Sequence, residues 1–106
     1  MRRVLHGDLV QLGRVLYAHD ADERRALIER AFAETRVAHQ HRLATGLWHP
    51  EFGDGSLAGW ASGRRRPPEP DLDDPVYAYG LMLILRQLAR GVETSGPRAS
   101  SWDTIS

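Results

Sequence analysis

At 106 residues, the chain is long enough for one domain and too short for two. The absence of cysteine excludes disulfides, thiolate metal sites and thiol nucleophiles. The N-terminus lacks the uninterrupted apolar region of a secretory signal. The longest apolar run, residues 76–85, is shorter than the roughly 20 residues that a membrane span needs. We therefore expect a globular, cytoplasmic protein that makes no contact with a membrane.

The charge of the chain is balanced overall but unevenly distributed. All 14 basic residues are arginine, and 14 Asp and Glu residues give a net charge of zero. Residues 1–66 have 11 Arg against 8 Asp and Glu (+3), whereas residues 67–106 have 3 against 6 (−3). One half could therefore face an anion and the other half a protein, although a domain with this balance is no strong nucleic-acid binder on charge alone.

A first helix is predicted from about Asp8 to Tyr17. Leucines recur at the alternating spacings of four and three that are typical of a short coiled-coil seam: Leu5, Leu9, Leu12 and Leu16, followed by His19. The same spacing fits an amphipathic helix packed in a core equally well. Gly13 lies beside this seam and would let a neighbouring backbone approach closely.

A second, longer helix is predicted from the Asp20 cap to about Thr45, with Gly46 ending it. The segment 20–23 resembles a capping box, with an aspartate at the cap and Glu23 three residues later. The short link between the two helices predicts an antiparallel hairpin. The expected buried stripe is Leu27, Ile28, Ala31, Phe32, Thr35 and Ala38. The opposite, solvated face contains Arg25, Glu29, Arg36 and Gln40.

Residues 47–63 mix tryptophan, phenylalanine, glycine and proline, which predicts a compact loop folded back onto the hairpin. Within it, Ser56 can cap a short helix that contains Leu57, Trp60 and Ala61. Residues 64–70 then form an extended, polyproline-like linker.

A third long helix is predicted from about Pro75 to Arg90, with Asp74 as its cap and Gly91 at its end. Its first turns, residues 76–85, are apolar on all sides, so it is either the central core helix or partly covered by another subunit. We favour a homo-oligomer. The candidate interface residues are Leu5, Leu9, Leu12, Leu16, Tyr77, Leu81, Ile84 and Leu88. Residues 1–91 would form the oligomerisation domain and residues 92–106 a flexible tail, with Trp102 and Ile105 as partner-binding residues.

No metal, cofactor or catalytic constellation is predicted. His39 and His41 point about 200° apart on a helix, and His41 could meet His49 only if the loop folds back. The aspartates at residues 71–74 lack the calcium-loop spacing and fit a linker ending in a helix cap. We therefore do not expect an enzyme.

The arginines are the one plausible feature for an anionic ligand. The triplet Arg64, Arg65 and Arg66 is the first candidate for contact with DNA phosphates, although such a triplet is usually a solvated loop. The other candidates are Arg2, Arg3, Arg24 and Arg25. No helix-turn-helix is found, because the turn at residues 18–20 leads into a long helix rather than a short recognition helix.

Several short motifs resemble the small protein encoded beside the large terminase of bacterial gene transfer agents, which is identified as their small terminase subunit. The similar stretches are residues 4–10, 41–46, 49–50, 53–57 and 70–75, within a match of about residues 2–91. The resemblance implies a phage-derived adaptor that assembles into an oligomeric ring, engages double-stranded DNA, and activates a large subunit with ATPase and nuclease activity. Gene transfer agents package host DNA almost indiscriminately, which fits the missing helix-turn-helix.

Together, these observations predict an all-α protein with a helical hairpin, a short loop helix, a third hydrophobic helix and a disordered tail. The expected function is a non-catalytic adaptor for DNA packaging that binds DNA weakly and without sequence specificity. The alternative is a helical regulatory or structural module that binds a protein and has no nucleic-acid role.

Overall fold

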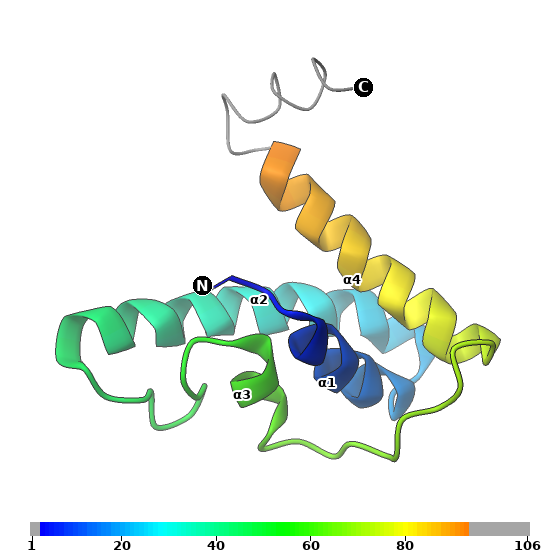
Figure 1. The fold of residues 1–106 in the computed structure, drawn as a ribbon, viewed down its shortest axis with the longest axis horizontal. Coiled ribbons are helices and arrows are strands. Elements are labelled where there is room, and N and C mark those ends of the chain that lie inside the picture. Colours follow the sequence, from blue (N-terminus) through cyan, green and yellow to red (C-terminus); the bar gives the residue numbers. More distant parts are fainter. Residues whose placement is uncertain (1–2, 94–106) are drawn as a thin grey trace.

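Every regular element of the computed structural model is a helix within residues 3–93, the part of the chain that it describes (Figure 1). The four helices are α1 (His6–Tyr17), α2 (Ala21–Thr45), α3 (Leu57–Ala61) and α4 (Pro75–Glu93). The all-α prediction is confirmed for this part of the chain. None of these helices is long and apolar enough to cross a membrane.

Helix α1 begins at His6, two residues before the predicted start at Asp8. Asp8 therefore lies inside the first turn of the helix. One carboxylate oxygen of Asp8 accepts a hydrogen bond from the backbone N–H of Leu5 at 2.8 Å. The other accepts one from the N–H of Ala58, in the first turn of α3, at 3.0 Å. Asp8 is only 2% exposed. A single buried side chain therefore satisfies free N–H groups at the starts of two helices.

Helix α2 begins after Asp20 and ends with Gly46 in the left-handed conformation (φ 74°), as the sequence predicted. The predicted capping box is wrong, because the Asp20 side chain makes no cap hydrogen bond. Oε2 of Glu23 instead lies 3.7 Å from Nδ1 of His19. The acidic residues of the first turn, Asp22 and Glu23, favour this end through the helix dipole.

The apolar stripe of α2 faces the core. All six predicted members are buried: Leu27, Ile28, Ala31, Phe32, Thr35 and Ala38. The four residues predicted on the opposite face are exposed: Arg25, Glu29, Arg36 and Gln40. The 3.6-residue period of the sequence therefore identified both faces correctly.

Helix α1 packs mainly against α3 and α4, and less against α2. The chain does turn back between α1 and α2, but this pair is not the main packing unit that the hairpin prediction implied. The close approach comes at Gly13, where an added Cβ would lie 2.7 Å from Cδ2 of Leu81 and 3.0 Å from Cε1 of Tyr77. The missing side chain of Gly13 thus lets α4 pack closely on α1.

The loop before α3 folds back onto α2, as predicted. Gly55 adopts a φ of 94°, and a Cβ there would lie 2.9 Å from the Cα of His39 in α2. Ser56 caps α3 by accepting a hydrogen bond from the N–H of Gly59 at 3.0 Å. Leu57, Trp60 and Ala61 of α3 are buried, so the loop fixes α3 between α1 and α2.

The linker between α3 and α4 is tied to α1 by side-chain hydrogen bonds. Arg14 Nε donates to the carbonyl of Pro67 at 2.8 Å. The Tyr17 hydroxyl donates to Asp74 at 2.8 Å, and the Tyr77 hydroxyl donates to Glu69 at 2.8 Å. Burial and the neighbouring carboxylate of Glu69 raise the pKa of Tyr77 to about 12, so its hydroxyl remains a donor at neutral pH.

Helix α4 begins as predicted, because Asp74 Oδ1 accepts hydrogen bonds from the N–H groups of Val76 (3.0 Å) and Tyr77 (3.3 Å). It ends later than predicted: Gly91 does not stop the helix, which continues to Glu93. A glycine inside a helix costs only about 1 kcal/mol relative to alanine, which neighbouring residues can offset.

One face of α4 is buried and another is apolar but exposed. Tyr77 and Ile84 are at most 1% exposed in the core. Four other apolar side chains of α4 are between 39% and 52% exposed: Val76, Tyr79, Met82 and Leu85. We call Tyr79, Met82 and Leu85 the apolar face of α4.

We predict that Asp8→Ala lowers the free energy of unfolding by about 2 kcal/mol, because two N–H groups lose a charged acceptor. Asp20→Ala is the matched control, since this aspartate also precedes a helix but makes no cap hydrogen bond. It should cost less than about 0.5 kcal/mol. Urea denaturation of both variants measures the difference, and equal losses would contradict the role assigned to Asp8.

Candidate anion-binding site

Arg64, the first residue of the predicted DNA-binding triplet, stabilises the fold. Its guanidinium carbon lies 3.8 Å from the ring centroid of Trp60, and its Nη2 lies 3.5 Å from Oε1 of Glu34. The same oxygen accepts a hydrogen bond from Nε1 of Trp60 at 2.9 Å. Burial disfavours the charge on Glu34, but hydrogen bonds from Trp60 and Arg30 and the nearby positive charges outweigh it, so the pKa of Glu34 lies below its ordinary value.

Two further candidates, Arg66 and Arg24, also make contacts within the chain. Arg66 Nη1 donates to Oε1 of Gln11 at 2.6 Å, which holds the linker against α1. Arg24 Nε donates to the carbonyl of Leu16 at 2.9 Å, near the C-terminal end of α1. These guanidinium groups already serve the fold. The triplet therefore does not form one fully exposed basic patch, because Arg64 and Arg66 are half-buried.

The remaining candidates are open to solvent or lie outside the described residues. Arg3, Arg25 and Arg65 are exposed. No hydrogen bond or ion pair of Arg25 or Arg65 occurs within residues 3–93. Arg2 lies outside the described residues.

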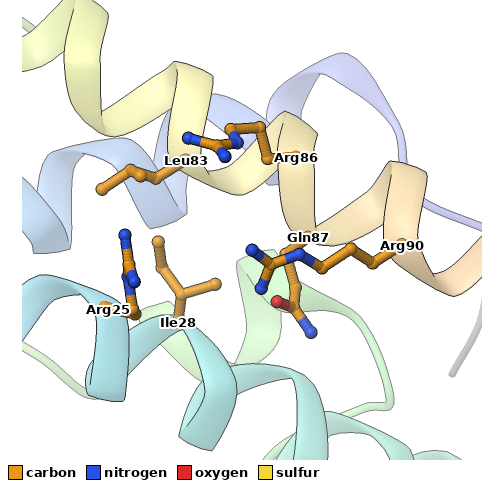
Figure 2. A pocket seen from close by; sticks show the side chains of 6 residues that line it. All are labelled: Arg25, Ile28, Leu83, Arg86, Gln87 and Arg90. Carbon is orange, nitrogen blue, oxygen red and sulfur yellow. The ribbon is translucent and has the colours of Figure 1, made fainter.

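Arg25 belongs to a cluster that the sequence did not reveal. It lies on α2 and faces Arg86 and Arg90 of α4 across a small pocket (Figure 2). The six lining residues are Arg25, Ile28, Leu83, Arg86, Gln87 and Arg90. Three guanidinium groups and one amide therefore surround a pocket that also has two aliphatic side chains. We call Arg25, Arg86 and Arg90 the arginine cluster.

The charge around this pocket is of one sign. No aspartate or glutamate is among its lining residues in the described part of the chain. Glu29 lies one helical turn from Arg25, but no ion pair joins them there. Arginine offers a planar, charged set of donors that fits phosphate or carboxylate oxygens. The arrangement is therefore suited to bind an anion.

Sequence reasoning missed Arg86 and Arg90, although the sequence contains a signal that these two members of the cluster lie together. Their spacing of four places both on one side of α4. What the sequence could not provide is the crossing of α4 over α2, which brings Arg25 to the same pocket. The consecutive arginines at 64–66 gave a stronger pattern in the sequence, but the fold already uses the side chains of Arg64 and Arg66.

The side chain of His49 stabilises the loop that precedes α3. The rings of His41 and His49 do meet, with centroids 5.2 Å apart. However, Nδ1 of His49 accepts hydrogen bonds from the N–H groups of Glu51 (3.0 Å) and Phe52 (3.1 Å). Among the residues the structure describes, no group of three or more potential ligands gathers around one point.

The eight predicted interface residues divide into three groups. Four are core residues of the single chain, at most 1% exposed: Leu12, Leu16, Tyr77 and Ile84. Three are half-buried and pack against that core: Leu9, Leu81 and Leu88. Leu5 is 53% exposed. A second copy could not reach the four core residues without opening the fold, so any contact would have to use exposed residues such as the apolar face of α4.

The predicted partner-binding residues Trp102 and Ile105 lie outside the described residues.

We predict that Arg64→Ala and Arg65→Ala differ in their effect on stability, although the two residues are adjacent. Arg64→Ala should cost about 1–2 kcal/mol, because it removes the contact with the Trp60 ring and the ion pair with Glu34. Arg65→Ala should change the free energy of unfolding by less than about 0.5 kcal/mol. Thermal unfolding monitored by circular dichroism checks both. A loss at Arg65 equal to that at Arg64 would contradict this division.

Comparison with known proteins gives one match. No curated protein and no solved structure matches the chain. Residues 2–88 match a family described as a domain of unknown function, DUF7742. This match covers α1, α2, α3 and most of α4, including Arg25 and Arg86 but not Arg90. The chain belongs to the DUF7742 family.

Proposed function

We propose that the chain is a non-catalytic, small terminase-like adaptor for DNA packaging that contacts DNA phosphates without reading their sequence. The observation that supports this most is the arginine cluster, where three cationic side chains from two helices border a pocket that no carboxylate of the described residues lines. Its edge is open, since Arg25, Arg86 and Arg90 are exposed. DNA offers a phosphate at every nucleotide, so such a cluster can bind it at any position.

The binding is weak and non-specific. Phosphate contacts position a protein on DNA but do not distinguish bases. The chain has no net charge, and several arginines near the predicted basic surface are already used within the fold. Few phosphates are therefore neutralised by each chain, so the affinity of a single chain should fall only moderately as the salt concentration rises. An assembly of several chains would add their contacts together.

Self-association is the second part of the proposal. The apolar face of α4 exposes Tyr79, Met82 and Leu85, at 52%, 39% and 51%. Contiguous exposed apolar side chains on one helix face are typical of a protein contact. Here this face replaces the buried seam residues as the proposed contact between copies.

The large terminase is the proposed partner. The resemblance to small terminase subunits suggests this partner, and Trp102 and Ile105 remain its proposed contacts in the tail. The chain would deliver DNA to this ATPase and nuclease, and would itself perform no chemistry.

A second candidate function is a protein-interaction module with no nucleic-acid role. The apolar face of α4 favours it, because that face needs only a protein. DNA retention separates the two proposals, since an interaction module would not retain DNA at low salt.

We predict that Arg25→Gln and Arg86→Gln each weaken binding to unrelated DNA sequences equally, and each reduce the slope of log affinity against log salt by about 1. Arg36→Gln is the control, because Arg36 is an exposed arginine of α2 that does not line the pocket. Fluorescence anisotropy with two unrelated duplexes over a salt series measures these effects. Strong preference for one duplex, or equal weakening by Arg36→Gln, would overturn the proposal.

We also predict that the wild-type chain is an oligomer at micromolar concentration and that Met82→Arg or Leu85→Arg lowers its native mass. A charged side chain in an apolar contact is costly to desolvate, whereas in the single chain both positions face solvent. Val37→Arg is the control, because Val37 is a 49% exposed residue of α2 outside the apolar face. Native mass spectrometry and circular dichroism report mass and folding. A monomeric wild-type protein would refute this part.

A further inference from the structure

The second half of α4 is weakly attached to the rest of the molecule. No residue from Leu85 to Gly91 is buried, and Leu88 is the one side chain in that range that packs against the hydrophobic core. In Figure 1, α4 rises away from α2 towards its C-terminal end. Few apolar contacts therefore determine the direction of this segment.

The arginine cluster lies where this segment leaves the body. Arg86 and Arg90 belong to the weakly attached segment, and Arg25 belongs to the firmly packed α2. Figure 2 shows the three side chains bordering the same pocket from these two helices. Without an anion, the like charges of α2 and α4 oppose their approach. With an anion between them, the same charges would join the two helices.

The size and lining of the pocket select the ligand. The space that a water-sized sphere can reach inside it is only about 20 Å³, far below the range of roughly 300–1,000 Å³ that drug-sized ligands occupy. The pocket therefore suits one small group rather than a whole nucleotide. The guanidinium groups of Arg25 and Arg86 and the Gln87 amide supply donors from both helices. A tetrahedral oxyanion can accept from several of them at once, whereas a planar carboxylate has only two oxygens.

We propose that the arginine cluster binds one phosphate group and that the bound group clamps the second half of α4 to α2. The inference rests on the proposed function only in naming DNA as a source of that group, since free phosphate has the same chemistry. Leu85, part of the apolar face, lies in the clamped segment. Phosphate binding would therefore also fix the orientation of a surface proposed for assembly, so that DNA would favour assembly.

Hydrogen exchange of the full chain, read for peptides within residues 85–91, tests the clamp. Inorganic phosphate and a short DNA duplex are each compared with chloride at equal ionic strength. At ten times its dissociation constant, phosphate should slow exchange in this segment by roughly tenfold if the clamped state alone binds it. Exchange in α1 should change little.

The variants Arg86→Gln in α4 and Arg25→Gln in α2 should each abolish this protection. In chloride, their melting temperatures should be no lower than that of the wild-type chain. Two variants keep the test valid if one fails to fold. Arg36→Gln should retain full protection. If Arg25 and Arg86 only stabilise the fold, their variants should melt at a lower temperature in chloride and still be protected by phosphate. That result would overturn the inference.

The two ligands separate this inference from the proposed function. Protection by both phosphate and DNA, lost in both variants, supports the clamp with DNA as a source. Protection by free phosphate alone supports the clamp and contradicts the DNA role. If DNA binds through Arg25 and Arg86 but exchange in residues 85–91 is unchanged, the clamp is wrong and the proposed function stands. Equal protection of every helix in all variants would show a general salt effect and overturn the clamp.

Discussion

The carboxylate of Asp8 is the contact on which the arrangement of the other elements depends. It accepts N–H groups from the starts of α1 and α3, which are far apart in the sequence. Once α3 is fixed there, Trp60 meets Glu34 of α2, and the linker that follows is led back along α1, where Arg14 holds it. This path leads to the start of α4, which then packs closely on α1 at Gly13.

The arginines divide into two physical classes that composition alone cannot separate. Arg14, Arg24 and Arg64 direct their guanidinium groups at carbonyls, an aromatic ring or a carboxylate of the same chain. Such groups are desolvated and already have partners, so an external phosphate would have to displace an internal one. Arg25 and Arg86 lie at an open pocket that, as far as the described residues go, no carboxylate lines. Because every basic residue of this chain is an arginine, the role of each arginine depends on the neighbours that the fold places around it.

Much of the fold could be predicted from local pattern. The stripe of α2, its end at Gly46, the Ser56 cap and the Asp74–Pro75 start each depend on residues within one element or its cap. The errors arose where distant residues compete. Asp8 was predicted only as a residue at the start of the first helix, but its carboxylate also bonds to α3. Leu12 and Leu16 were predicted as a seam between chains, but they fill the core of one chain. The arginine cluster forms only because α4 crosses α2. Periodicity identifies an apolar face but not what covers it.

The central claim is that Arg25 and Arg86, and not Arg14, Arg24 and Arg64, meet the phosphates of DNA. Side-chain Nε–Hε resonances of the arginines in nuclear magnetic resonance spectra report each guanidinium separately while duplex DNA is added. The account predicts that the signals of Arg25, Arg86 and Arg90 shift together and saturate at one DNA concentration, while those of Arg14, Arg24 and Arg64 stay in place. Shifts concentrated on Arg64 and its neighbours, with the cluster unmoved, would contradict it.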